Sequence, residues 1–198
     1  MIKRIGGILV TDAADATHVI AGSKDTAMRR TPKLMIGLCK TSNIVDLDWL
    51  IQSDKQRKVL PSTKFLIKDK HAEAQYNFDL RTSLMRAGKM RCSGKTLLDG
   101  YSVYCCNGVA GNKKKGNMTP PTKEFRMILE AAGAKWITSI PNKKDCSGVI
   151  ILVSKVQAEA KRQLSTKKVR DALSRGSLTK TTEEIFHSIM VQQFVASK

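Results

Sequence analysis

The feature that most constrains the fold is one pattern of short apolar segments that occurs in both halves of the chain. The segments "GILVTDAA", "ATHVIAGS" and "RTPKLMIGLCK" follow one another in the first half, and "AKWITSIP", "SGVIILVS" and "TKKVRDALSRG" repeat that order in the second. The segments "NIVDLDWLIQSDKQ" and "SLTKTTEEIFHSIMVQQ" then close the two copies. Their periodicities predict strand, strand, helix, strand, helix in each copy. Two such runs indicate two copies of a small α/β unit with a parallel sheet.

In the first copy, we expect strands over 8–10, 17–22 and 44–45, and helices over 32–40 and after Asp46. The helix from Pro32 has a good N-cap in Thr31, and proline is tolerated in the first turn because its missing N–H needs no partner there. Arg29, Arg30 and Lys33 surround this start, although helix N-termini favour acidic neighbours. An anion is therefore expected to bind there.

The sequence of residues 70–98 is typical of a connector that is partly helical around "FDLRTSLMRAG". Its apolar side would consist of Phe78, Leu80, Leu84 and Met85, and this apolar content favours packing over free movement. We therefore expect a first domain over 1–69, a linker over 70–98 and a second domain over 99–198.

In the second copy, we expect a strand over 101–105 and a helix over 122–132 that Gly133 ends. The intervening "NGVAGNKKKGNMTPP" predicts a solvated loop, with Lys113–Lys115 as a solvated charge run. Thr181 and Glu184 have the spacing of a capping box, which predicts that the last helix begins there.

Charge and cysteine usage narrow the functional classes. The chain has 35 Lys and Arg against 17 Asp and Glu, a net charge of +18, which favours polyanionic partners. Five cysteines without a C-x-x-C pair indicate reduced thiols in an intracellular protein, without a disulfide framework or zinc site. No apolar run approaches the roughly 20 residues that span a bilayer, and no signal peptide is evident. We therefore expect a cytosolic or nuclear protein with no membrane contact.

No catalytic set is apparent. His18, His71 and His187 are too scattered to indicate a metal site or a triad, and His18 within an apolar strand is typical of a packed histidine. Cys105 and Cys106 are adjacent on a strand and would point to opposite faces. The sequence predicts a protein that is not an enzyme and needs no cofactor or metal.

Several motifs together resemble the tandem BRCT domain. In the first copy these are "IGGILV", "ATHVIAG", "RTPK" and "IVDLDWLIQS", and in the second "LLDGYSVY" and "EAAGAKW". The resemblance covers nearly the whole chain, and the paired arrangement with a helical linker is specific. The resemblance is strongest to the C-terminal BRCT pairs of DNA-damage checkpoint mediators and of their insect mutator-type counterpart. It implies two α/β repeats, each a small parallel sheet flanked by helices, joined by a partly helical linker.

The resemblance also implies a missing element. A BRCT repeat begins with a central strand whose Ser/Thr-Gly end helps to hold phosphate, whereas this chain begins at "MIKRIGG". The first repeat is therefore expected to lack its opening strand. We expect the chain to be a fragment of a longer protein; a site that works differently and an inactive site are the alternatives.

The resemblance assigns roles to residues of this sequence. Lys33 and Thr31 would bind the phosphate of a phosphoserine, and Arg30 a C-terminal carboxylate. Three aromatic residues, Trp49, Trp136 and Phe186, would be core. Asn107 and Gly108 would continue the peptide groove in the second repeat, although both are equally typical of a plain turn.

The function implied is a phosphoprotein-binding module of a nuclear, chromatin-associated checkpoint adaptor. Its partner would be the phosphorylated tail of the histone variant found at DNA double-strand breaks. One alternative is direct DNA binding through basic tracts such as "KRQLSTKKVR", although aromatics are few and nonspecific attraction is the simpler expectation. The other is a structural scaffold whose phosphate site is inactive.

Overall fold

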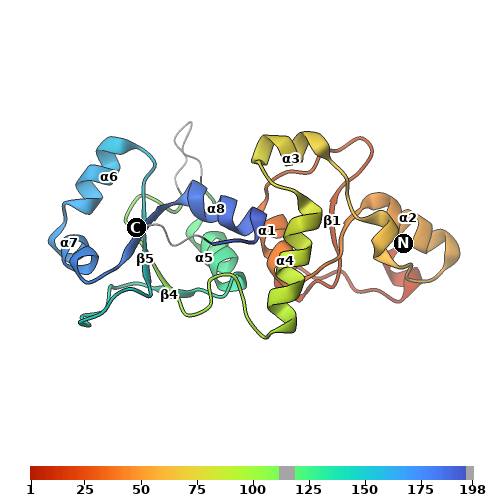
Figure 1. Cartoon of the computed structure of the whole chain (residues 1–198). Helices are drawn as coiled ribbons and strands as arrows, with labels where there is room; N and C mark the ends of the chain where they lie inside the picture. Colours follow the sequence, from red (N-terminus) through yellow and green to blue (C-terminus); the bar gives the residue numbers. More distant parts are fainter. Residues whose placement is uncertain (112–118, 195–198) are drawn as a thin grey trace. The chain divides into compact units, whose positions relative to one another are not determined.

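The computed structural model describes residues 1–111 and 119–194. The chain forms two compact units (Figure 1). Unit 1 contains Met1–Ser93 and Met190–Gln192, and unit 2 contains Gly94–Ile189 and the residues from Gln193 onward. The predicted linker over 70–98 thus lies mostly within unit 1. The predicted solvated run Lys113–Lys115 lies outside the described residues.

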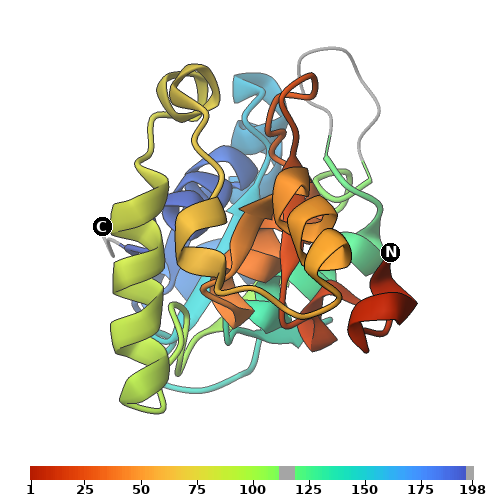
Figure 2. The same ribbon diagram turned by 90° about the vertical axis from the view of Figure 1, so that its right-hand side faces the viewer.

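Unit 1 contains a two-stranded parallel sheet with helices and three short 3-10 helices around it. The strands are β1 (Val19–Gly22) and β2 (Ile44–Asp46), with Val19 opposite Ile44. The helices are α1 (Pro32–Lys40), α2 (Leu47–Gln56), α3 (Lys70–Tyr76) and α4 (Leu80–Cys92), and the 3-10 helices are η1 (Ile2–Ile5), η2 (Ala13–Asp15) and η3 (Ser62–Phe65). Helix α4 contacts α1 and runs along one side of the unit (Figure 2).

The core of unit 1 forms around α1, which is buried continuously from Leu34 to Cys39. A Cβ on Gly37 would lie 2.8 Å from Val19 Cγ2, so only glycine lets the helix approach β1 this closely. Trp49 is 6% exposed, stacks on His18 with ring centroids 4.3 Å apart, and donates from Nε1 to the Leu60 carbonyl at 2.9 Å. Burial lowers the pKa of His18, which favours the neutral ring in this stack.

Unit 2 has a four-stranded, all-parallel sheet in the order β4-β3-β5-β6. Its strands are β3 (Ser102–Cys105), β4 (Lys135–Ile137), β5 (Val149–Val153) and β6 (Leu178–Thr181), and its helices are α5 (Thr122–Ala131), α6 (Gln157–Leu164), α7 (Lys167–Ser174) and α8 (Thr182–Val191), whose last residues belong to unit 1. All five residues of β5 are buried, as expected of a strand flanked on both sides. Phe125 packs edge-on against both Phe186 and Trp136, at 5.4 and 6.2 Å between ring centroids.

The structure confirms the parallel sheets and several local predictions. Helix α1 covers the predicted range, and Asp46 caps α2 by accepting from the Asp48 amide at 2.8 Å. The predicted capping box forms at α8, where the Thr181 amide donates to Glu184 Oε2 at 2.7 Å and the Glu184 amide donates to Thr181 Oγ1 at 3.3 Å. Local residue patterns therefore placed these helix starts correctly.

The predicted strand over 8–10 is wrong. Ile8 and Leu9 are 87% and 80% exposed, and within the described chain no strand pairs with them. The matching segment of unit 2, β4, is a strand because it pairs with β3. Unit 1 has no strand in the position that β3 occupies in unit 2, so 8–10 has no partner.

Three smaller differences also follow from tertiary context. Met85 is 54% exposed, so it is not part of the apolar side of α4, where Ala87 is buried instead. Trp136 lies at the margin of the core and is half-buried, whereas Phe186 is 5% exposed. Helices α3 and α6 are additional to the predicted elements, because their polar sequences carry no apolar periodicity.

Candidate functional site

The predicted anion site lies at the N-terminus of α1. Thr31 is the N-cap, and its Oγ1 accepts a hydrogen bond from the Leu34 amide at 3.2 Å. Pro32 occupies the first helical position, and no acidic residue lies in the first turn. Lys33 is exposed in that turn, next to the positive end of the helix dipole.

Arg30 lies one residue before the N-cap and makes a cation–π contact with an aromatic ring. Its guanidinium carbon is 5.5 Å from the centroid of the Tyr76 ring, at the last residue of α3. A cation over the face of a tyrosine ring is attracted to it electrostatically. The contact therefore holds the Arg30 guanidinium group beside the start of α1, where its fork of donors suits a carboxylate.

A single carboxylate positions the segment that carries Arg30. Asp69 Oδ2 accepts from the Met28 amide and Oδ1 from the Ala72 amide, both at 2.9 Å. The hydrogen bonds from Ala72 and Met28 lower the pKa of Asp69, because they stabilise its charged form. Asp69 thus caps α3 and at the same time ties the chain before α1 to that helix.

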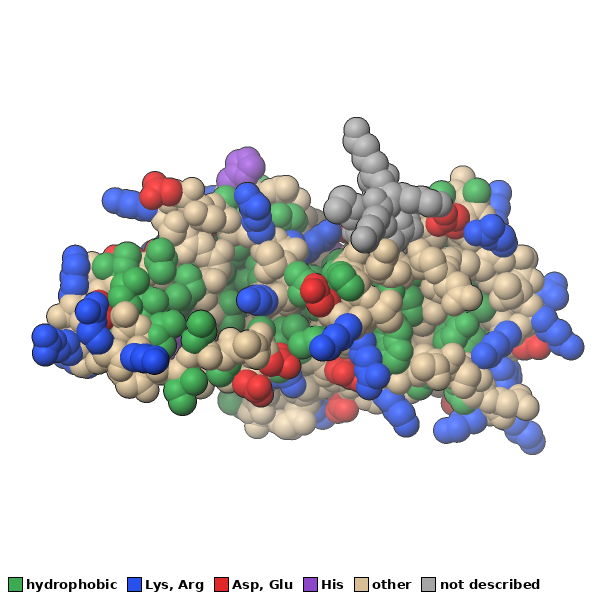
Figure 3. Space-filling model, turned by 180° about the vertical axis from the view of Figure 1, so that it is seen from behind, with side chains coloured by type: hydrophobic (Ala, Val, Ile, Leu, Met, Phe, Trp, Pro, Cys, Tyr) green, Lys and Arg blue, Asp and Glu red, His purple; other side chains and the backbone are tan. Residues whose placement is uncertain are grey.

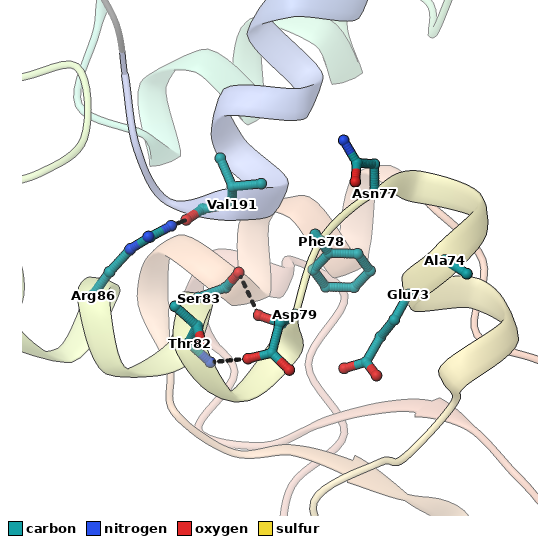
Figure 4. Close-up of a pocket in the computed structure, with 9 residues that line it drawn as sticks. All are labelled: Glu73, Ala74, Asn77, Phe78, Asp79, Thr82, Ser83, Arg86 and Val191. Atoms are coloured by element: carbon teal, nitrogen blue, oxygen red, sulfur yellow. Dashed lines mark hydrogen bonds between the residues drawn. The ribbon is translucent and has the colours of Figure 1, made fainter.

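A hollow of about 440 Å³ lies in unit 1 beyond the end of α3 (Figure 4). Its lining consists of Glu73, Ala74, Asn77, Phe78, Asp79, Thr82, Ser83, Arg86 and Val191. Its three charged side chains, Glu73, Asp79 and Arg86, are engaged in the fold. Figure 4 shows Arg86 extended toward the Val191 carbonyl, to which it donates at 3.0 Å. Glu73 accepts from the Leu80 amide at 2.9 Å, and Asp79 from the Thr82 amide at 2.7 Å. These carboxylates hold helix ends, so the hollow offers a shaped recess and not an acid–base pair.

Asn107 and Gly108 belong to unit 2, directly after β3 and Cys106. Both are exposed, and Gly108 has a φ of 80°, which suits glycine in a turn. The Asn107 carbonyl accepts from Gln163 Nε2 at 3.0 Å. The structure thus brings Arg30, Thr31 and Lys33 together at one helix start and places Asn107 and Gly108 in the other unit; their role in a groove stays a prediction.

The cysteines and histidines form no reactive centre in the part of the chain that is described. All five thiols are free, and burial raises the pKa of Cys105 to about 12 and that of Cys106 to about 11, which keeps both protonated. Among residues 1–111 and 119–194, no group of three or more His, Cys, Asp or Glu could hold a metal ion. No described helix is both long enough and apolar enough to cross a membrane.

Sequence reasoning missed two residues of this site, Tyr76 and Asp69. Asp69 had a local signal, because it stands three residues before Ala72 in the spacing of an N-cap. Tyr76 had none, since its contact with Arg30 depends on how α3 packs beside the start of α1.

Comparison with known proteins supports one family. No protein-family model matches the chain. Mediator of DNA damage checkpoint protein 1 from Homo sapiens is 31% identical over 150 residues, which is 76% of this chain and 6% of that protein. PAX-interacting protein 1 from Mus musculus is 32% identical over 138 residues, covering 70% of this chain and 11% of that protein. The chain therefore spans only a small part of the curated relatives it matches.

The fold gives an independent comparison. The crystal structure of the BRCT5-BRCT6 domains of S. pombe Brc1 matches with a TM-score of 0.72 and 16% identity, covering 98% of this chain and 87% of the other. The observed fold, with two repeated α/β units and parallel sheets, is consistent with these relatives. The chain belongs to the tandem BRCT family.

Proposed function

We propose that the chain is a non-enzymatic phosphoprotein-binding module of a nuclear DNA-damage checkpoint adaptor. It binds a phosphoserine close to a free C-terminus. The preferred ligand is the phosphorylated tail of the histone variant at DNA double-strand breaks, which would hold the adaptor on damaged chromatin. Its relatives include a protein named as a DNA-damage checkpoint mediator, which supports this proposal.

The observation that carries the proposal is the convergence of cationic groups at the start of α1. The ammonium group of Lys33 and the positive end of the helix dipole favour a phosphate, while the Arg30 fork suits a planar carboxylate. In the absence of a ligand, these cations oppose the dipole by a few tenths of a kcal/mol each. A bound anion removes that repulsion.

The test compares three short peptides by calorimetry: one phosphorylated with a free C-terminus, one unphosphorylated, and one phosphorylated but amidated. We expect Lys33→Met to weaken binding of both phosphorylated peptides by about 10- to 100-fold, as for lost hydrogen bonds to a charged group. Arg30→Gln should weaken only the peptide with a free carboxylate.

Matched controls come from the same segment. Lys40→Met removes a lysine from the opposite end of α1, and Arg29→Gln removes the exposed arginine beside Arg30. Both should bind like the parent protein. Lys33→Met should also raise the stability of the free protein slightly, because it removes charge repulsion from the helix dipole.

Two results would overturn the proposal. One is an unchanged affinity in Lys33→Met and Arg30→Gln, which would leave these cations as a solvated helix end. The other is the absence of any phosphate-dependent binding by the parent protein, as expected of a scaffold with an inactive site.

A further inference from the structure

The second basic surface of the molecule lies on unit 2 and is separate from α1. It includes six exposed cations: Lys143, Lys161, Arg162, Lys167, Lys168 and Arg170. We refer to these six residues as the α6–α7 surface. Figure 3 shows Lys and Arg side chains gathered at the end of unit 2 that carries α6 and α7 in Figure 1.

A second basic tract of the sequence, the loop that contains Lys143, lies beside the C-terminal end of α7. Helices α6 and α7 contact one another. Arg175, at the C-terminal end of α7, donates to the Lys143 carbonyl at 2.6 Å and to Asn142 Oδ1 at 3.2 Å, and its own carbonyl accepts from the Cys146 amide at 2.8 Å. Arg175 therefore holds the loop that contains Lys143 against α7.

Few acidic groups offset these charges. Over 155–175, Lys and Arg outnumber Asp and Glu by seven to two. Of the two acids, Glu159 accepts from Ser154 Oγ at 2.9 Å, which directs its carboxylate toward the end of β5. The other acid, Asp171, is exposed on α7. The charged side chains of α6 and of the first turn of α7 are therefore mostly cations.

The chemistry of the surface favours the backbone of duplex DNA over other polyanions. Single strands are held by stacking on exposed aromatics, but Tyr104, the aromatic beside α7, is covered by Lys168 at 5.4 Å from the ring centroid. Membrane-binding helices insert a broad apolar face. Within 155–175, Val156 is the single large hydrophobic residue that is exposed, so this segment has no such face. Spread lysines and arginines without an apolar or stacking element match a row of phosphates.

We propose that the α6–α7 surface of unit 2 binds the phosphate backbone of double-stranded DNA, without base specificity. This contact is independent of the α1 site. It holds the module on DNA while α1 remains available for a phosphopeptide.

The experiment measures binding of the full chain to a short fluorescent duplex by anisotropy over a range of salt concentrations. The test variant is Lys161→Glu, Lys167→Glu and Arg162→Glu combined. The control variant combines Lys55→Glu, Lys58→Glu and Lys64→Glu, which makes the same charge change at exposed positions of unit 1. Circular dichroism and phosphopeptide titration verify that both variants fold.

We expect the affinity of the parent protein to fall linearly with salt on logarithmic axes. The test variant should bind more than about tenfold more weakly at low salt, with a slope smaller by about two to three, since each phosphate contact contributes about 0.9. The control variant should lose much less affinity and keep the slope.

Equal losses in the two variants would overturn the proposal, because binding would then depend on the net charge of +18 alone. So would an absence of duplex binding by the parent protein. Binding to phosphatidylserine vesicles in preference to the duplex would assign the surface to membranes instead. Phosphopeptide affinity is a separate readout, so failure here leaves the function of α1 untouched.

Discussion

At the scale of single residues, the cation–π contact between Arg30 and Tyr76 connects α3 to the proposed carboxylate site. The guanidinium carbon lies 5.5 Å from the ring centroid, and the attraction favours this placement of the group. A cation–π contact at a partly exposed site contributes about 0.5–1 kcal/mol. Tyr76 is therefore expected to act through Arg30 and not on the phosphate.

Tyr76→Ala should weaken binding of a phosphopeptide with a free C-terminus by about two- to fivefold, the equivalent of that contact. Calorimetry with the amidated peptide supplies the second readout, and there the affinity should not change. Tyr76→Phe keeps the ring and should bind like the parent protein. A similar loss for both peptides would mean that Tyr76 supports the whole site and not Arg30 in particular.

At the scale of elements, Asp69 joins the N-terminus of α3 to the chain before α1. Its lowered pKa means that the folded protein favours the carboxylate. The stability it contributes is present above the pKa of unfolded Asp, about 3.9, and is lost as the pH falls through the lower folded value. Acid is therefore expected to release α3 and Tyr76 from the start of α1.

Asp69→Asn should lower the melting temperature at neutral pH, because an amide has one acceptor oxygen for two backbone donors. It should also flatten the fall in melting temperature below about pH 4, since the group that titrates is gone. Scanning calorimetry over a pH series measures both. Asp25→Asn, at an exposed carboxylate of the same unit, is the control, and an equal flattening there would rule out Asp69 as the cause.

Residues 8–10 and β4 show that a strand depends on its neighbours as well as on its own sequence. Leu9 and Trp136 occupy matching positions in the repeated segments, but Leu9 is 80% exposed and Trp136 packs against Phe125. Leu9→Lys should change the free energy of unfolding by less than about 0.5 kcal/mol, as for other surface positions. Trp136→Lys should cost on the order of 2–3 kcal/mol, because it removes an aromatic packing contact and places a charge at the core margin. Urea unfolding measures both, and equal costs would show that 8–10 is packed.

Whether a feature could be predicted from the sequence depends on how far apart along the chain its interacting groups lie. Helix α1, the Asp46 cap and the Thr181–Glu184 capping box were predictable, because the groups that form them are within four residues of one another. The strand over 8–10 was not, since its partner must come from another segment. In the same way, Arg30 and Lys33 could be recognised from "RRTPK", whereas the contact with Tyr76 required the packing of α3.

At the scale of the whole molecule, the two repeats share a fold but differ in how much sheet they contain. Strand β5 is paired on both sides, with β3 and β6, and all its residues are buried. Strand β1 pairs with β2 alone, and Ile20 on it is 41% exposed. Local opening should therefore require less free energy in the sheet of unit 1 than in that of unit 2.

Hydrogen–deuterium exchange tests this difference within one sample. Amides of Ile150, Ile151 and Leu152 in β5 should exchange more than about tenfold more slowly than those of Ile20 and Ala21 in β1, after correction for intrinsic rates. Strand β4, at an edge of the larger sheet, is the internal control and should exchange faster than β5. If β1 and β5 exchanged equally slowly, the sheet of unit 1 would be as stable as the larger one despite its single pairing. The two strands would then have to open in a common unfolding event, and pairing on both sides would not be what sets their protection.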